Sequence, residues 1–239
     1  MQRLIVIEGL IGAGKTTLCR LLAAQWGAQL VLEPSENNPF LAPYYADPKR
    51  YAFPVQMFYL VNRWRQQDQI RQPDLFHGLV VSDYLFAKDR MFAEKTLEPQ
   101  ELELYDRFAG ALGESSPRPD LVIYLDVPTP VLLRRIARRA CEGESAINAA
   151  YLDDLRERYE RLWTSFNVCP VLRLDNRDMN YADEPDGQRR ILEVIARALE
   201  GFVPSDTYGG GGARSPEEGA PGFEPNREDQ PSLFGAAGG

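Results

Sequence analysis

The sequence predicts an α/β fold in which a five-stranded parallel sheet is flanked by helices and followed by a disordered C-terminal tail. Three observations lead to this prediction. A glycine-rich loop separates a strand-like run from a helix-like run near the N-terminus, short β-branched runs then alternate with helical patterns, and the composition changes abruptly after Phe202. Strands that alternate with helices along a chain are typical of a parallel sheet with right-handed crossovers.

The glycine-rich loop is the segment Gly9–Thr17, which matches the pattern G-x-x-x-x-G-K-[ST] of the phosphate-binding loop, or P-loop. Glycines let the backbone wrap closely around a polyphosphate, and the N–H groups that open the following helix form an anion cradle. Lys15 can contact the β- and γ-phosphates, and the Thr16 hydroxyl can bind Mg²⁺. The candidate nucleotide-binding residues of this loop are Gly9, Gly12, Ala13, Gly14, Lys15, Thr16 and Thr17.

The remaining elements follow from hydrophobic periodicity. Strands are expected at residues 4–7, 29–32, 79–81, 121–127 and 171–174. Helices are expected at residues 18–24, 52–70, 86–94, 99–112, 131–139, 151–166 and 188–199, and the polar, proline-rich stretch from residue 35 to 48 is expected to be irregular. The run 121–127 is apolar and β-branched throughout, as is typical of a strand buried on both faces.

The composition argues against several classes of protein. A net charge of −8 is a poor match for a protein that binds nucleic acid directly or lies on an anionic membrane. The three cysteines include no C-x-x-C pair, which argues against a zinc site or a disulfide framework. No apolar run approaches membrane-spanning length, and Met1–Arg3 leads straight into the first strand, so we expect a cytoplasmic protein without a signal peptide.

The composition divides the chain into a folded domain at residues 1–203 and a disordered tail at 204–239. The tail contains the linker Gly209–Gly212 and a Pro-, Gly- and acid-rich stretch that is too polar to form a core. Near its end, Gln230, Leu233 and Phe234 form a Gln-x-x-Leu-Phe pattern that resembles the bacterial sliding-clamp-binding peptide. Two interpretations stay open: the tail tethers the protein to a sliding clamp, or it has no partner.

Two carboxylates follow predicted strands, at the edge of the sheet where open α/β folds bind ligands. Asp83 ends the strand that begins at Leu79, where it can hold Mg²⁺ or, together with Ser82, cap a helix. Glu33 ends the strand that begins at Gln29, where it can deprotonate an attacking hydroxyl or be a solvated loop acid.

Two sets of polar residues lie on predicted helices. Gln56 and Arg63 are seven residues apart and share one helix face, where a glutamine suits a nucleobase edge or, alternatively, bonds to backbone at the margin of the core. Four arginines occupy the helix that follows the fourth strand: Arg134, Arg135, Arg138 and Arg139. They can close over phosphates and stabilise transition-state charge, or they form a solvated basic face.

Taken together, these motifs resemble the deoxyribonucleoside kinase family, most closely its bacterial deoxyadenosine/deoxyguanosine kinase branch. The resemblance covers residues 1–198 and rests on five features: the P-loop, the segment Glu33–Phe40, Gln56 with Arg63, the segment Ser82–Ala93, and the arginine helix followed by Tyr151-Leu152. It implies a P-loop kinase that transfers the γ-phosphoryl group of MgATP to the 5′-hydroxyl of a deoxyribonucleoside, with a purine preferred. It also implies a homodimer and a role in nucleotide salvage.

The resemblance also implies roles for individual residues. Glu33 would take the proton of the 5′-hydroxyl. Asp83, also a catalytic candidate, would serve magnesium together with Thr16, although the matching acid of the family is sometimes named as the proton acceptor. Gln56, Arg63 and Asp89 would read the base, and Tyr45 and Glu144 would meet the sugar 3′-hydroxyl. Arg135 and Arg139 would be two of three arginines that close over ATP. Two positions depart from the family pattern, because Tyr84 and Cys141 stand where the family has arginines.

Two other functions remain open at this point. A nucleoside monophosphate kinase of the thymidylate-kinase type shares the sheet, the P-loop and the arginine helix that closes over the phosphates, but it needs an extra arginine site for the phosphate of the acceptor. A P-loop ATPase that couples hydrolysis to motion would turn over ATP without any nucleoside.

Overall fold

The computed structural model describes residues 3–32, 38–71, 77–113, 116–139 and 147–200. Its centre is a five-stranded, wholly parallel sheet in the order β2-β3-β1-β4-β5. The strands are β1 (Arg3–Gly9), β2 (Gln29–Val31), β3 (Leu79–Ser82), β4 (Leu121–Asp126) and β5 (Val171–Asp175). Both the number of strands and their parallel arrangement confirm the prediction from sequence.

The chain crosses from one side of β1 to the other between β3 and β4, which makes β1 the switch point of the sheet. The pair Gly9↔Leu125 brings the carboxyl end of β4 beside the end of β1, and the pair Val6↔Ser82 shows that β3 ends beside the middle of β1. Ligands of open parallel sheets bind outside the carboxyl ends of the strands at such a point. The P-loop, which directly follows β1, therefore occupies the expected position for a binding site.

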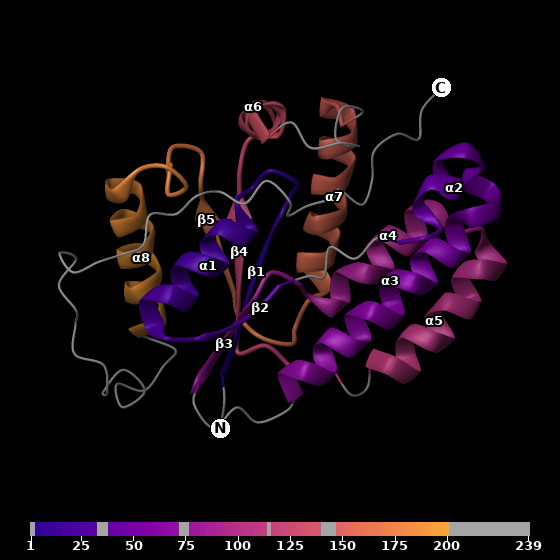
Figure 1. The fold of residues 1–239 in the computed structure, drawn as a ribbon, viewed down its shortest axis with the longest axis horizontal. Helices are drawn as coiled ribbons and strands as arrows, with labels where there is room; N and C mark the ends of the chain where they lie inside the picture. The colour runs from indigo at the N-terminus through magenta and orange to yellow at the C-terminus, as the bar shows by residue number, and fades with distance from the viewer. Residues whose placement is uncertain (1–2, 33–37, 72–76, 114–115, 140–146, 201–239) are drawn as a thin grey trace.

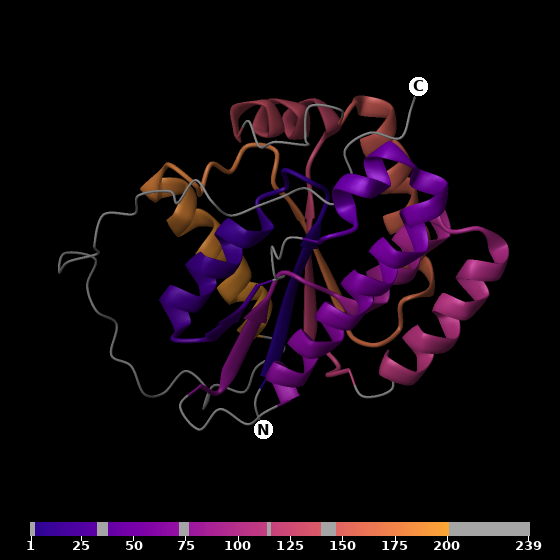
Figure 2. The same ribbon diagram turned by 45° about the vertical axis from the view of Figure 1, so that its right-hand side comes forward.

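Helices cover both faces of the sheet (Figure 1). Helices α1 (Lys15–Trp26) and α8 (Pro185–Glu200) lie on one face, and α3 (Pro48–Arg71), α4 (Asp89–Thr96), α5 (Pro99–Gly113) and α7 (Ala149–Ser165) lie on the other. Helix α6 (Thr129–Arg139) lies across the carboxyl ends of the strands, as both views show (Figure 2).

The largest hydrophobic core lies around β1 and β4 and includes Ile7, Leu18 and Ile123, each fully buried. Helices α3, α4 and α5 share a separate cluster that includes Val55, Leu60 and Tyr105. The side of the molecule that carries the predicted base-reading residues thus has its own apolar centre, distinct from the core around the P-loop strand.

Apart from shifts of two or three residues at the ends of α1, α6 and α7, the structure differs from the sequence prediction in three places. The proline-rich stretch expected to be irregular contains a short helix, α2 (Leu41–Ala46), whose Pro43 is tolerated because it lies in the first turn. The helix expected at 86–94 is a 3₁₀ turn, η1 (Phe86–Lys88), followed by α4. Helices α3 and α8 begin earlier than expected, at Pro48 and Pro185, because proline suits the first helical position.

No helix among the residues that the structure describes is both long enough and apolar enough to cross a membrane.

Candidate active site

The P-loop connects β1 to α1 through a turn that requires glycine. Gly12 and Gly14 have φ angles of 80° and 97°, in the left-handed region that other residues avoid. Space is restricted as well, because a Cβ on Gly12 would come within 3.0 Å of Ile136 on α6. Lys15 opens α1, and its ammonium donates to the carbonyl oxygens of Gly9 (2.9 Å) and Leu10 (3.2 Å).

Asp83 follows β3 and reaches the P-loop side chain expected to bind metal. The Thr16 hydroxyl donates to Asp83 Oδ2 at 2.8 Å, and Asp83 is only 5% exposed. The helix-capping alternative is not observed, because Leu85 is the N-cap of η1 and no side chain caps it. A hydroxyl and a carboxylate in contact form a small set of hard oxygen donors.

This donor set fits Mg²⁺ better than a metal held by protein ligands alone. The described residues contain no group of three or more His, Cys, Asp or Glu side chains that could hold an ion. Mg²⁺ bound with a nucleotide commonly uses one or two protein oxygens and completes its shell with phosphates and waters. Thr16 and Asp83 meet that requirement.

The predicted base-reading residues meet between α3 and α4. Arg63 and Asp89 form an ion pair whose side chains are 3% and 2% exposed. The Arg63 guanidinium also lies over the rings of Tyr59 and Tyr84, at 5.1 and 4.9 Å from their centroids. Tyr84, which stands where the family has an arginine, therefore packs against the cation of this pair.

Gln56 lies two turns before Arg63 on α3 and is 3% exposed. Its Nε2 donates to the Thr96 hydroxyl at 2.9 Å, and that hydroxyl donates to the Phe92 carbonyl oxygen at 3.1 Å. The partner of Gln56 is thus a side chain at the end of α4, rather than the backbone group that the alternative interpretation expected.

A buried ion pair that we did not predict joins the P-loop strand to the segment after Asp83. Glu8 is fully buried, and its Oε1 lies 3.2 Å from the Lys88 ammonium and accepts from the Leu85 N–H at 2.9 Å. Its Oε2 accepts from the Tyr159 hydroxyl at 2.8 Å. A charged carboxylate that is buried in a mostly apolar strand requires an ion-pair or hydrogen-bond partner. The sequence pattern alone does not identify that partner.

Helix α6 lies against the P-loop through Arg135. This guanidinium donates to the carbonyl oxygens of Ala13 (3.3 Å) and Asn176 (2.9 Å), and its burial lowers the pKa of Arg135. Arg139 is exposed one turn further on. The four arginines therefore do not form one uniform basic face, because Arg135 is half-buried against the loop.

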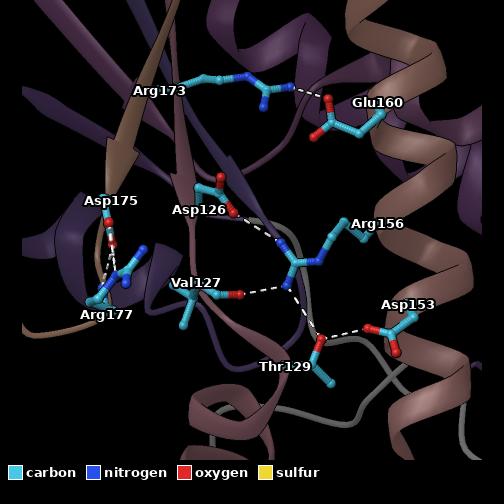
Figure 3. A network of polar contacts seen from close by, with 9 residues as sticks. All are labelled: Asp126, Val127, Thr129, Asp153, Arg156, Glu160, Arg173, Asp175 and Arg177. Carbon is cyan, nitrogen blue, oxygen red and sulfur yellow. Dashed lines mark hydrogen bonds and ion pairs between the residues drawn. The ribbon is translucent and has the colours of Figure 1, made fainter.

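A second unpredicted network fixes the start of α6 (Figure 3). Arg156 on α7 donates to Asp126 Oδ1 at 2.9 Å, to the Val127 carbonyl oxygen at 2.6 Å and to the Thr129 hydroxyl at 3.5 Å. The Thr129 hydroxyl in turn donates to Asp153 at 2.6 Å. These contacts join both the end of β4 and the start of α6, the helix that carries Arg135, to α7.

Several predicted residues lie outside the part of the chain that the structure describes. These are Glu33, Cys141 and Glu144, together with the tail at 204–239, which includes Gln230, Leu233 and Phe234. Tyr45 belongs to α2, but its side chain is not described.

Comparison with known proteins identifies the family. A family model described as deoxynucleoside kinase matches residues 5–200. Deoxyguanosine kinase of Bacillus subtilis (strain 168) is 38% identical over 157 residues, covering 65% of this chain and 76% of that protein. Deoxyadenosine/deoxycytidine kinase of the same organism is 30% identical over 204 residues, covering 82% and 93% of the two chains.

The fold agrees with these relatives. The structure of deoxyadenosine kinase from M. mycoides with bound dATP has a TM-score of 0.67 and 25% sequence identity, covering 82% of this chain and 99% of that one. These matches favour the deoxynucleoside kinases over the thymidylate-kinase-type and ATPase alternatives. The chain belongs to the deoxynucleoside kinase family.

Proposed function

We propose that this enzyme transfers the γ-phosphoryl group of ATP to the 5′-hydroxyl of a purine deoxyribonucleoside, deoxyadenosine or deoxyguanosine, in nucleotide salvage. The observation that carries the proposal is the short path from Asp83, in contact with the P-loop Thr16, to Asp89, paired with Arg63. Only five residues of chain separate a phosphate-side acid from a pair suited to base recognition. The relatives named deoxyguanosine and deoxyadenosine kinases support the choice of purine.

On the donor side, the loop residues 9–17 bind the ATP triphosphate, with Arg135 and Arg139 as further contacts. Thr16 and Asp83 would hold Mg²⁺, which would supply positive charge to neutralise the charge that develops on the transferring phosphoryl group. Lys15 leaves the loop carbonyls and turns to the phosphates, because an ammonium gains more from a phosphate oxygen than from a neutral carbonyl.

On the acceptor side, Gln56, Arg63 and Asp89 read the base, and Tyr45 and Glu144 contact the sugar 3′-hydroxyl. Glu33 accepts the 5′-hydroxyl proton as the new oxygen–phosphorus bond forms and the bond to the β,γ-bridging oxygen breaks, which releases ADP. Little covalent chemistry is required of the protein, so positioning and charge supply most of the rate.

A substrate panel tests the proposal. The purified chain is incubated with MgATP and each of the four deoxynucleosides, and in parallel with deoxynucleoside monophosphates. We expect deoxyadenosine and deoxyguanosine to be converted to monophosphates fastest, and chelation of Mg²⁺ to stop the reaction. Conversion of monophosphates to diphosphates, or ATP hydrolysis without any acceptor, would instead identify one of the two alternatives.

Glu33→Gln tests the proposed base. We expect kcat to fall by about 10²- to 10⁴-fold, the usual contribution of a general base, with little change in deoxynucleoside binding. Turnover near that of the wild type would show that another group takes the proton.

Arg63→Ala tests the proposed reader of the base. Because Arg63 is buried between α3 and α4, far along the chain from the P-loop, we expect its loss to weaken deoxynucleoside binding by about tenfold or more while ATP binding changes little. Equal weakening of both ligands would count against base recognition.

Two further proposals concern partners. We propose a homodimer, supported by Leu104 and Phe108, which are 44% and 46% exposed and four residues apart on one face of α5.

We also propose that the domain at 1–203 ends in a tail at 204–239 whose Gln230, Leu233 and Phe234 bind a sliding clamp. Light scattering tests the first, and a clamp pull-down with Leu233→Ala/Phe234→Ala as control tests the second.

A further inference from the structure

The P-loop is held from outside by side chains that follow β5. The Asn176 side-chain nitrogen lies 3.0 Å from the Ala13 carbonyl oxygen and 3.0 Å from the Tyr181 hydroxyl. The Tyr181 hydroxyl lies 3.2 Å from the Gly14 carbonyl oxygen. Asn176 is fully buried and Tyr181 is 3% exposed, so water does not compete for these hydrogen bonds.

The chemistry of the groups fixes which atom donates. A carbonyl oxygen only accepts, so the Asn176 atom that faces Ala13 must be the amide nitrogen. Burial raises the pKa of the Tyr181 hydroxyl, which therefore keeps its proton and can donate it. The Tyr181 hydroxyl lies 3.3 Å from Ala13 O and 3.2 Å from Gly14 O, but it has one hydrogen to donate. Because Ala13 O already accepts from Asn176 and Arg135, we assign that hydrogen to Gly14 O.

With this assignment, both carbonyls have a full set of donors. Gly14 O also accepts the Leu18 N–H at 3.0 Å, the first hydrogen bond of α1. A carbonyl oxygen has two lone pairs, and each of these two oxygens accepts from two donors. The directions of the Ala13 and Gly14 carbonyl groups are therefore fixed.

Fixed carbonyls imply fixed amides. The peptide bond is planar and trans, so the C=O and N–H groups of one peptide point in opposite directions. Holding Ala13 O and Gly14 O toward Asn176 and Tyr181 turns the N–H groups of Gly14 and Lys15 to the opposite side, where the anion cradle of a P-loop forms.

We propose that Asn176 and Tyr181 are positioning residues for the donor triphosphate, which act by orienting the amides of Gly14 and Lys15. This inference rests on the proposed binding of ATP to the P-loop. The side chains do not touch the phosphates, and their effect is to have the loop in its binding conformation before ATP arrives. A binding site preorganised in this way loses less free energy when its ligand binds.

The close fit of Tyr181 to the loop supports this role. A Cβ on Gly14 would lie 2.3 Å from the Tyr181 hydroxyl oxygen, which is far shorter than a van der Waals contact. Any residue other than glycine would therefore displace the tyrosine or the loop. The tyrosine thus leaves room for glycine alone and contacts the loop at its most restricted residue.

The test compares Tyr181→Phe and Asn176→Ala with wild-type enzyme, with ATP binding measured by calorimetry and steady-state kinetics measured for both substrates. We expect each variant to raise the Kd and KM for ATP about fivefold, the value of one neutral hydrogen bond, and the double variant to raise them more. We expect the KM for the deoxynucleoside to stay within about twofold of wild type. A purely structural role would not separate the two substrates.

Tyr124→Phe is the matched control, because the Tyr124 hydroxyl in β4 is buried and has no hydrogen-bond partner among the described residues. We expect it to leave the affinity for ATP unchanged. Unchanged ATP affinity in both test variants, or parallel losses for both substrates, would overturn the inference, as would a wild-type chain that fails to bind ATP. ATP binding that weakens in the variants of a chain that phosphorylates no deoxynucleoside would uphold it and overturn only the proposed reaction.

Discussion

The buried pair of Glu8 and Lys88 allows a quantitative prediction. Their side chains are 0% and 5% exposed, and 3.2 Å separates the charged atoms. At an effective dielectric constant of about 20, the direct attraction at this distance is about 5 kcal/mol. Desolvation offsets much of that attraction while the pair is intact, but removal of one partner leaves the other charge buried, which typically costs about 3–5 kcal/mol.

We therefore expect Lys88→Met and Glu8→Gln each to lower the free energy of unfolding by about 3–5 kcal/mol. The variant with both substitutions should lose less than the sum, with a coupling energy of about 2–3 kcal/mol. Urea unfolding can be followed by tryptophan fluorescence. One of the three tryptophans, Trp163, reports on this region, because its ring lies 5.8 Å from that of Tyr159, the tyrosine that donates to Glu8.

The control for this cycle is the pair of Arg107 and Glu103 on α5, with side chains that are 74% and 68% exposed. Arg107→Met should not change the urea midpoint measurably, because exposed pairs contribute little. Losses for Glu8→Gln and Lys88→Met that add within about 0.5 kcal/mol would refute the reasoning, since independent sites behave in that way.

Two more predictions follow from the described contacts. Arg156→Gln removes the guanidinium from Asp126 and should cost about 2 kcal/mol, which lowers the melting temperature by about 4–8 °C; Arg161→Gln, an exposed position on the same helix, should leave it unchanged. Burial raises the pKa of Cys169 from 9.0 to about 11, so at pH 8 its alkylation should be about a hundredfold slower in the folded protein than in urea. That difference should shrink to about tenfold at pH 10, because the thiolate fraction of the unfolded chain is then near its maximum; equal rates at pH 8, measured by mass spectrometry of the Cys169 peptide, would contradict the burial argument.

Local sequence patterns predicted the parts of the fold that local physics decides. The strands and most helices follow from hydrophobic periodicity, and the P-loop follows from a nine-residue segment between two such elements. Asp83 could be expected beside the loop because β3 pairs with β1 in the usual order of such sheets. Helix α2 was missed because its proline and its short length hide a helical period.

The contacts that hold the site could not be predicted in the same way. Tyr181 and Asn176 meet Ala13 across more than 160 residues of chain, at 168 and 163 positions of separation. Neither hydrophobic periodicity nor a short motif can predict a hydrogen bond from a side chain to a carbonyl that is so distant along the chain. Glu8 gave the strongest local signal, a carboxylate in an apolar strand, but its partner Lys88 emerges only when η1 is placed beside β1.

These contacts share a pattern that bears on how the enzyme works. The loop and its strand are fixed by α6 through Arg135, by the β5–α8 connection through Tyr181, and by the β3–η1 segment through the partner of Glu8. These three segments are far from one another along the chain, and each begins or ends at a strand of the sheet or lies beside it. The ion pair of Arg63 and Asp89, which we propose reads the base, lies instead between helices that share their own apolar cluster. The two parts meet at one place, because Lys88 and Asp89 are adjacent and the cations of Lys88 and Arg63 lie over the same Tyr84 ring. Under the proposed roles, a substitution in this segment should affect both the phosphate loop and the acceptor, whereas a substitution in α3 or α5 away from Tyr84 should affect the acceptor alone.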